Sequence, residues 1–160
     1  MRDGGVQTLV RDDALDYGPL RESLGFLIRI GQLKIFEQFY AQVGDLGLRP
    51  GEFSVLWLIL RNPGVRQGVL AQELLIKPAH MTKLVRGFED RGFVARVVPD
   101  DDRRAVELSL TAAGRDFVEG HKAAFFAVHE HPLSRLTQPE QDELRRLLQK
   151  LAGLERGGAA

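Results

Sequence analysis

The fold of this chain is decided by residues 67–111, which read QGVLAQELLIKPAHMTKLVRGFEDRGFVARVVPDDDRRAVELSLT. Apolar residues recur at helical spacing over 67–75, and again from Pro78 to about Gly92. Proline is well tolerated at the first position of a helix, and glycine commonly follows the last turn. The stretch therefore predicts two short helices separated by a tight turn.

A charged hairpin is predicted after the second helix. Two strands are expected over 93–98 and 105–110, and the loop 99–104 between them carries three aspartates and two arginines. Helix, turn, helix and hairpin in this order are typical of a winged helix-turn-helix, a shape that binds double-stranded DNA. With further helices on both sides, the predicted fold class is mainly α with a small β-wing.

The helix that begins near Pro78 has an apolar back and a polar front. Leu84, Val85 and Phe88, together with Met81, are spaced to face inward. Such a helix fits the major groove, where the N-terminal half reaches base edges and phosphates. The alternative is a solvated amphipathic helix whose basic residues only remain in water. The candidate DNA-binding residues here are Lys77, Ala79, His80, Thr82, Lys83 and Arg86.

The hairpin loop adds Asp102, Arg103 and Arg104 as candidate DNA contacts. Asp102 and Arg104 are two residues apart in a tight turn, where a charge-assisted hydrogen bond would hold the guanidinium extended. An extended arginine at a hairpin tip suits a narrow minor groove. Read alone, the loop also fits an ordinary charged turn.

The chain divides into a central domain and flanking segments. The winged helix-turn-helix domain is assigned to 50–111, between outer helical segments over 20–48 and 112–154. Residues 1–18 lack periodicity and are expected to form a mobile arm, and 155–160 are expected to fray.

Four helices are predicted outside the helix-turn-helix. Their expected bounds are Leu20 to Val43, Pro50 to Arg61, a helix capped by Thr111 that runs to about His131, and Pro139 to Leu154 with Thr137 or Gln138 as its cap. The inner face of the second of these is expected to consist of Phe53, Leu56, Trp57 and Leu60.

The outer helices carry more apolar residues than one core stripe requires. An apolar surface of that size indicates packing between the N- and C-terminal helices of two chains, that is, a homodimer. Packing of these helices back onto the central domain is the alternative.

Composition excludes several classes of protein. The chain has 160 residues and no cysteine, so disulfides and cysteine-ligated zinc are absent. No stretch approaches the ~18 apolar residues of a membrane span, and the N-terminus has no apolar signal core, so a cytoplasmic location is expected.

The formal net charge is +0, and the stretch from Lys77 to Arg104 contains seven Lys and Arg and five Asp and Glu. The geometry of the charges, rather than their sum, must therefore account for DNA binding.

Several runs resemble the signature of MarR-type transcriptional regulators. They are Leu70–Leu74, Met81–Val85, Phe88–Val94 and Asp101–Thr111 with Gly114. The most specific part is D-x-R followed by an apolar strand that ends in L-T-x-x-G. The resemblance implies an obligate homodimer with a winged helix on each subunit and dimerisation helices at both ends, a pseudo-palindromic DNA operator, and release by a small ligand.

The resemblance also assigns roles within 20–154 of this sequence. It implies that Arg104 is the minor-groove arginine of the wing, that Asp102 positions it, and that residues 79–86 face the major groove. The sequence departs from the family at Lys77-Pro-Ala-His80, where Ser, Thr or Asp is common. The lack of cysteine excludes the thiol-oxidation branch.

An effector site is expected between the dimerisation helices and the winged domain, as in the family. An arginine among aromatic side chains suits an aromatic carboxylate, so a phenolic or benzoate-like effector, or its CoA thioester, is expected. Residues 24–32 also resemble regulators of aromatic-acid catabolism. The alternative is that the aromatic residues are core and Arg29 faces solvent. The candidate residues are Phe26, Arg29, Ile30, Leu33, Phe53, Trp57, His129 and His131.

The predicted function is a ligand-responsive transcriptional regulator of the repressor type. A winged-helix module used for protein contact is the alternative, favoured by the zero net charge. The sequence contains no nucleophile–base pair, phosphate loop or H-E-x-x-H, so no enzyme activity, cofactor or metal is expected.

Overall fold

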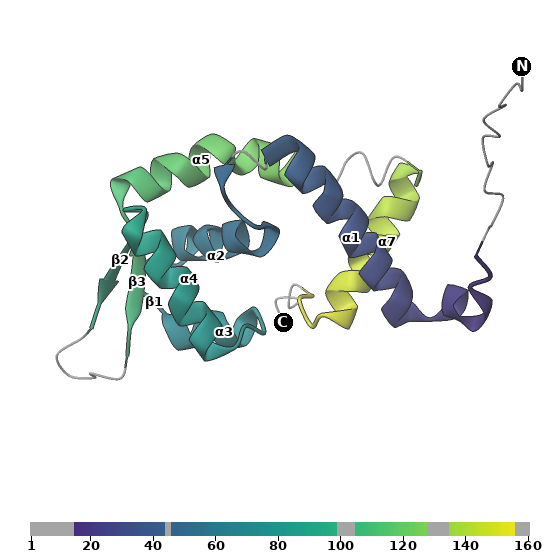
Figure 1. Cartoon of the computed structure of the whole chain (residues 1–160), viewed down its shortest axis with the longest axis horizontal. Coiled ribbons are helices and arrows are strands. Elements are labelled where there is room, and N and C mark those ends of the chain that lie inside the picture. The colour runs from purple at the N-terminus through teal and green to yellow at the C-terminus, as the bar shows by residue number, and fades with distance from the viewer. Residues whose placement is uncertain (1–14, 44–45, 99–104, 128–134, 156–160) are drawn as a thin grey trace, which may run out of the picture. The chain divides into compact units, whose positions relative to one another are not determined.

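The structure, a computed structural model, describes residues 15–43, 46–98, 105–127 and 135–155 (Figure 1). The chain forms two compact units, Met1–Leu33 and Lys34–Ala160. Helices with a small antiparallel sheet make up the described residues, which confirms the predicted fold class.

The first unit contains a short 3-10 helix, η1 (Gly18–Glu22), and the beginning of α1 (Leu24–Val43). One continuous helix from Leu20 was predicted, and that prediction is wrong at Ser23. The backbone of Ser23 is extended, and its hydroxyl accepts a hydrogen bond from the Phe26 N–H at 3.4 Å. Ser23 therefore begins α1 as an N-cap.

The second unit contains the winged helix-turn-helix and the C-terminal helix. Its elements are the end of α1, α2 (Pro50–Arg61), β1 (Val65–Arg66), α3 (Gln67–Glu73), α4 (Pro78–Asp90), β2 (Val94–Val97), β3 (Glu107–Leu110), α5 (Ala112–Ala127) and α7 (Gln138–Leu151). The helix-turn-helix, α3 and α4, has the predicted position. Both predicted strands are present but shorter, because the ladder begins at Val94 and pairs Val97 with Glu107.

The sheet has three strands in the order β1-β3-β2, whereas two were predicted. Gly64 adopts a positive φ of 78°, which turns the chain after α2 back along β3. The Gly64 N–H donates to Leu108 O at 2.9 Å, and the Gln67 N–H donates to Val106 O at 2.8 Å. The wing therefore pairs with the residue that begins α3.

The core of the second unit lies between α2, α4, α5 and the sheet. Trp57 and Leu60 were predicted to lie on the inner face of α2, but both are only half-buried. The buried stripe of α2 is rotated toward Val55 and Ile59, because α2 packs against both α5 and β3. The side chains that are less than 2% exposed are Phe53, Val55, Leu56, Ile59, Met81, Val85, Leu108 and Val118.

The start of α5 is joined tightly to the start of β2. The Thr111 hydroxyl accepts from the Gly114 N–H at 3.0 Å and donates to Gly92 O at 2.6 Å. The Thr111 N–H donates to Phe93 O at 3.0 Å. A Cβ on Gly114 would lie 2.0 Å from Phe93 O, so only glycine allows this approach. The L-T-x-x-G run is therefore a structural joint between wing and helix.

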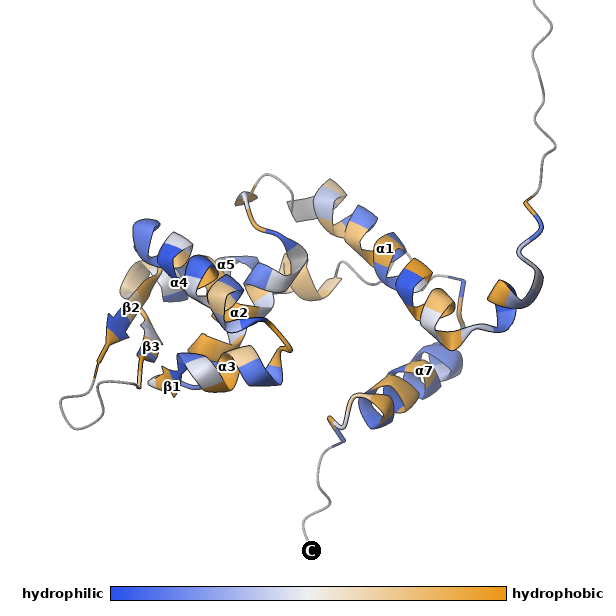
Figure 2. Ribbon diagram, turned by 60° about the horizontal axis from the view of Figure 1, so that its bottom comes forward, coloured by the Kyte–Doolittle hydropathy of each residue, from blue (hydrophilic) through white to orange (hydrophobic). Residues whose placement is uncertain are grey.

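The outer helices expose their leucines. On α7, Leu144, Leu147, Leu148 and Leu151 are 38%, 48%, 41% and 70% exposed, and Figure 2 shows apolar residues running along this helix. Thr137 precedes α7, as predicted, and Glu140 accepts from its N–H at 2.7 Å. Among the described helices, none combines the length and apolar character that a membrane crossing requires.

Candidate nucleic-acid interface

Helix α4 presents its apolar face to the core and its polar face to solvent. Met81, Val85 and Phe88 are buried, whereas Leu84 is half-buried. Four inward positions were predicted, and these three are confirmed. The candidate DNA-binding residues Lys77, Ala79, His80, Thr82, Lys83 and Arg86 are all exposed.

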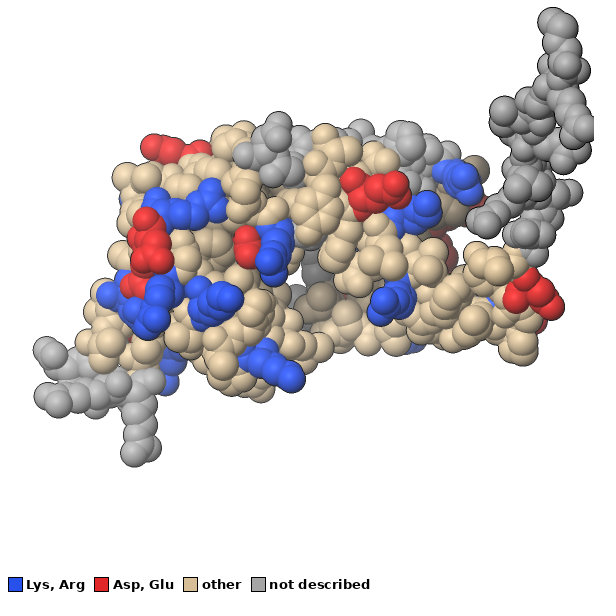
Figure 3. Space-filling view, viewed as in Figure 1, with Lys and Arg blue, Asp and Glu red and all other residues tan. Residues whose placement is uncertain are grey.

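Two cations on α4 are free to meet an anion. Lys83 and Arg86 have no ion-pair or hydrogen-bond partner among the described residues, and both are exposed. Figure 3 shows Lys and Arg side chains gathered over the surface where α3 and α4 lie, with acidic side chains between them. One of the acids on α4, Glu89, accepts two hydrogen bonds from the Arg96 guanidinium of β2, at 3.1 and 2.8 Å. This pairing neutralises one carboxylate beside the predicted DNA face.

One flank of α4 is held by α3. The Gln67 side-chain Nε2 donates to the Thr82 hydroxyl at 3.0 Å, and that hydroxyl donates to Pro78 O at 3.0 Å. Gln67 is the first residue of α3, so this contact fixes the two helices of the helix-turn-helix to each other.

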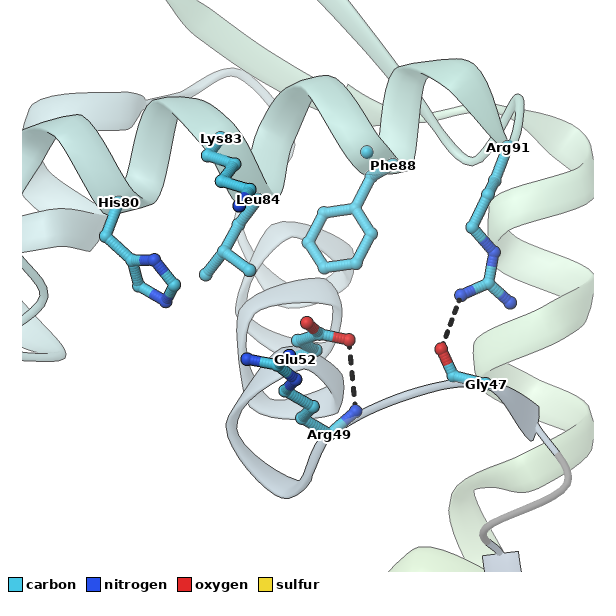
Figure 4. A pocket seen from close by; sticks show the side chains of 9 residues that line it. Gly47, Arg49, Glu52, His80, Lys83, Leu84, Phe88 and Arg91 are labelled. Carbon is cyan, nitrogen blue, oxygen red and sulfur yellow. Dashed lines mark hydrogen bonds between the residues drawn. The ribbon is translucent and has the colours of Figure 1, made fainter.

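The other flank of α4 borders a cleft of about 290 Å³. In Figure 4 the side chains of His80, Lys83, Leu84 and Phe88 extend from α4 toward the N-terminus of α2. Glu52 lies on the opposite wall, where its carboxylate accepts from the Arg49 N–H at 3.0 Å. His80 and Lys83 therefore lie on the α2 side of α4, and Thr82 lies on the α3 side.

Arg91 ties the end of α4 to three other segments. Its guanidinium donates to Leu46 O at 3.1 Å and to Gly47 O at 3.3 Å. It also lies 4.7 Å from the ring centre of Phe93 and 5.6 Å from that of Phe117. The two rings stack with their centres 4.5 Å apart. A cation over stacked rings rigidifies the joint between α4, β2 and α5.

Several predicted site residues lie outside the described residues. They are Asp102, Arg103 and Arg104 of the wing loop, together with His129 and His131. The strands β2 and β3 on either side of the wing loop are described, and their pairing is that of a hairpin.

The predicted effector residues fall in different units. Phe26, Arg29, Ile30 and Leu33 lie on the part of α1 before Lys34, where Phe26 is half-buried and the other three are exposed. Phe53 is 1% exposed, and its ring stacks on Phe125 with the ring centres 4.2 Å apart. Trp57 is half-buried and meets Phe126 edge-on at 5.0 Å. That these residues form one pocket stays a prediction.

Metal ligands do not gather in the part of the chain that the structure describes, where no group of three or more His, Asp or Glu could hold an ion. His121 lies 2.7 Å from the Phe117 carbonyl oxygen through its Nδ1, and its ring packs on the ring of Phe117.

Sequence reasoning missed two residues that organise this surface. The sequence analysis singled out neither Gln67 nor Arg91 as a contact residue. Neither is part of a periodic pattern, and the contacts of Gln67 with Thr82 and of Arg91 with Leu46 span 15 and 45 positions. Only the polar character of Gln67 at a helix start pointed to a possible partner.

Comparison with known proteins identifies the family. Residues 48–106 match the MarR family model. The HTH-type transcriptional repressor Rv2887 of Mycobacterium tuberculosis is 34% identical over 129 residues, which are 80% of this chain and 92% of the relative. The putative transcriptional regulatory protein for the hcr operon of Thauera aromatica is 30% identical over 86% of this chain and 83% of its own length.

Solved structures share the fold. The transcriptional repressor CouR, bound to a 23-mer DNA duplex, has a TM-score of 0.75 and 34% identity, covering 89% of this chain and 99% of its own. The MarR family protein Rv2887 in complex with p-aminosalicylic acid has a TM-score of 0.65 and 32% identity, covering 81% and 98%. The winged fold, the exposed cations of α4 and the similarity to these relatives all indicate the same family. The chain belongs to the MarR family, and it is a transcriptional repressor rather than an enzyme.

Proposed function

We propose that this repressor binds a pseudo-palindromic DNA operator as a homodimer and releases it when a small aromatic carboxylate binds. The observation that carries the DNA contact is the outer face of α4, where Lys83 and Arg86 are exposed and lack partners among the described residues. The inner face of the same helix is buried, so α4 is a rigid element that presents these cations to a groove. CouR, a relative at 34% identity, was solved bound to a DNA duplex.

The remaining candidate contacts surround this pair. Lys77 at the start of α4 suits a phosphate, Ala79 and His80 lie in its first turn, and Thr82 is exposed on the side of α4 that faces α3. In the wing, we propose that Arg104 enters the minor groove, with Asp102 positioning it and Arg103 beside it. Two grooves are then read by each subunit.

The homodimer is supported by the exposed leucines of α7. Leu144 and Leu147 line an apolar hollow on this helix together with Leu136 and Pro139. Solvent-exposed leucines at helical spacing are costly in a monomer and are expected to be covered by a second chain. A two-fold axis would then place two copies of α4 about one helical turn of DNA apart.

The effector is proposed to be an aromatic acid or its CoA thioester. Rv2887, at 32% identity, was solved with p-aminosalicylic acid and with salicylic acid. Arg29 is exposed on α1 near Phe26, and an arginine beside aromatic rings suits a benzoate-like carboxylate. The proposed lining residues are Phe26, Arg29, Ile30, Leu33, Phe53 and Trp57, with His129 and His131 as further contacts.

The test of the DNA contact compares two arginines. Arg86→Ala should weaken operator binding by about 1–3 kcal/mol, because it removes a groove contact. Arg145→Ala removes the same charge from α7 and should leave binding unchanged. Fluorescence anisotropy on an operator isolated by selection from genomic fragments gives both values, and melting curves check the fold. For wild type, a slope of about −5 in log affinity against log salt is expected for six phosphate contacts.

Equal affinity of the two variants would exclude α4 as the reading element. In the same assay Arg104→Ala should weaken binding by about 1–3 kcal/mol without unfolding the dimer.

Addition of salicylate should release the operator from wild type, and Arg29→Ala should reduce that response while leaving DNA affinity intact.

A further inference from the structure

The hydroxyl group of Thr82 is already committed inside the protein. It donates its single proton to Pro78 O at 3.0 Å and accepts a hydrogen bond from Gln67 Nε2 at 3.0 Å. A hydroxyl has one proton and two acceptor lone pairs. Thr82 therefore retains one lone pair and no proton for any partner outside the chain, although its side chain is exposed on α4.

This commitment restricts what Thr82 can read. Guanine N7 and O6, thymine O4 and the phosphate oxygens are all acceptors, and a hydroxyl without a free proton cannot donate to them. What Thr82 still offers to DNA is its γ-methyl group and one acceptor lone pair, and that lone pair suits only the amino groups of adenine and cytosine. In the major groove, the apolar feature that matches a methyl is the C5-methyl of thymine.

Gln67 fixes the rotamer that makes this reading possible. The two hydrogen bonds on the Thr82 oxygen, one along α4 and one from α3, hold the side-chain torsion in a single position, and the methyl with it. An unconstrained threonine on a helix exchanges between two rotamers. The Gln67 N–H donates to Val106 O at 2.8 Å, so the backbone of Gln67 is itself anchored to the wing.

The side-chain amide of Gln67 bonds to Thr82 through its Nε2, but this arrangement reduces the stability of the fold. Its Oε1 is buried and has no hydrogen-bond partner among the described residues. A buried acceptor without a partner destabilises the fold, and an apolar side chain of similar length would avoid that loss. Position 67 therefore carries a polar amide whose side-chain hydrogen bond goes to Thr82, an exposed residue of α4.

We propose that Thr82 reads a thymine through its methyl group and that Gln67 is the positioning residue that holds the methyl toward DNA. This inference rests on the proposed function, since it requires α4 to lie in the major groove. It assigns a specificity role to Gln67, and it makes Thr82 an apolar contact rather than a hydrogen-bond donor.

The test replaces each thymine of the operator half-site by deoxyuridine, one position at a time. Deoxyuridine lacks only the C5-methyl, so wild-type protein should lose affinity at one position per half-site. The expected loss is about four-fold per half-site, the value of one buried methyl group. Anisotropy titrations at fixed salt measure each dissociation constant.

Two variants of Thr82 separate the methyl from the hydroxyl. Thr82→Val keeps a methyl in both branches, so it should retain operator affinity and the uridine-sensitive position. Thr82→Ser keeps the hydroxyl and removes the methyl, so it should bind thymine and uracil operators equally. Its affinity should match that of wild type on the uridine operator. The opposite pattern, with Thr82→Ser like wild type and Thr82→Val weakened, would show hydroxyl reading and overturn the proposal.

Gln67→Met tests the positioning role, because it removes the buried Oε1 together with the hydrogen bond to Thr82. Its melting temperature should be unchanged or higher, its salt slope unchanged, and its thymine-over-uracil preference reduced. A variant that melts normally and keeps the full preference would exclude Gln67 as the positioning residue. Failure of wild type to bind any operator would contradict the proposed function. Binding without a uridine-sensitive position would contradict only the methyl reading.

Discussion

The winged helix-turn-helix and the C-terminal helix differ in where their apolar side chains lie. In the winged part, seven large side chains are less than 2% exposed, among them Phe53, Met81 and Leu108. On α7, Leu147, Leu148 and Leu151 are 48%, 41% and 70% exposed. The first region buries its core within one chain, whereas the second presents an apolar stripe that still needs a cover. The winged region is therefore packed by its own residues, whereas α7 exposes the leucines that the proposed homodimer would cover.

The strongest test of this difference places a charge among the exposed leucines of α7. Leu148→Glu should raise the dimer dissociation constant by at least about a hundred-fold. Each lost leucine burial is worth about 1.5–3 kcal/mol, and a two-fold axis counts it twice. Analytical ultracentrifugation over a concentration series measures the effect.

The matched control for this change is Gln149→Glu, which adds the same charge to the polar side of α7. It should leave the dimer intact. If both variants stay dimeric, the leucine stripe is not the interface. If Leu148→Glu unfolds the winged region as well, the two regions are less independent than their burial indicates.

The second prediction compares two glycines of α5. Gly114→Ala should destabilise the fold by about 3 kcal/mol, because its Cβ would lie 2.0 Å from Phe93 O and backbone cannot yield cheaply. At Gly120 an added Cβ would meet no atom of the described residues within 4 Å beyond its chain neighbours and the backbone of its own helix, so Gly120→Ala should stabilise α5 by about 0.5–1 kcal/mol. Urea unfolding of both variants gives the two values. Equal changes in stability would contradict the close approach of α5 to β2.

The smallest expected effect is on the pH dependence of the stability of α7. Hydrogen bonds from the Thr137 backbone and hydroxyl hold the pKa of Glu140 below its ordinary value. A folded pKa below the unfolded one stabilises α7 above the unfolded pKa, and this contribution is lost as the pH falls through the folded pKa. Glu140→Gln should therefore lower α7 stability slightly at neutral pH and show less change on acidification.

Circular dichroism between neutral and acid pH measures that difference, with Glu73→Gln as a control that removes a carboxylate from the end of α3. If Glu140→Gln and wild type lose helicity in parallel in acid, the Thr137–Glu140 cap does not contribute.

Periodic patterns in the sequence predicted most helices and strands, but they could not predict contacts between residues far apart in the chain. The inward positions Met81, Val85 and Phe88 follow from helical spacing, because burial of an amphipathic helix is imposed by its own sequence. The strand β1 has two residues, too few to show any period, and it exists because Gly64 turns the chain toward β3. The face of α2 was misjudged for a related reason, since two neighbours bury it from different sides.

The candidate site shows the same division. Exposure of Lys83 and Arg86 could be predicted from one helix alone. The cleft beside His80, with Glu52 across it, depends on where α2 ends up in the fold. The hydrogen bond of Gln67 to Thr82 joins two helices and leaves Gln67 Oε1 without a partner in the part of the chain that the structure describes, and no local propensity favours such a contact.

Arg91 has a mechanical consequence for regulation. Arg91 donates to the segment before α2 and lies over the Phe93–Phe117 stack, so it links the end of α4, the start of β2 and the first half of α5. We therefore expect a displacement of α5 to move α4 and the strands of the wing together, as one rigid body. In the proposed function, an effector would then release DNA by changing the angle at which the two winged regions of the homodimer meet the duplex, without deforming α4 or the wing strands.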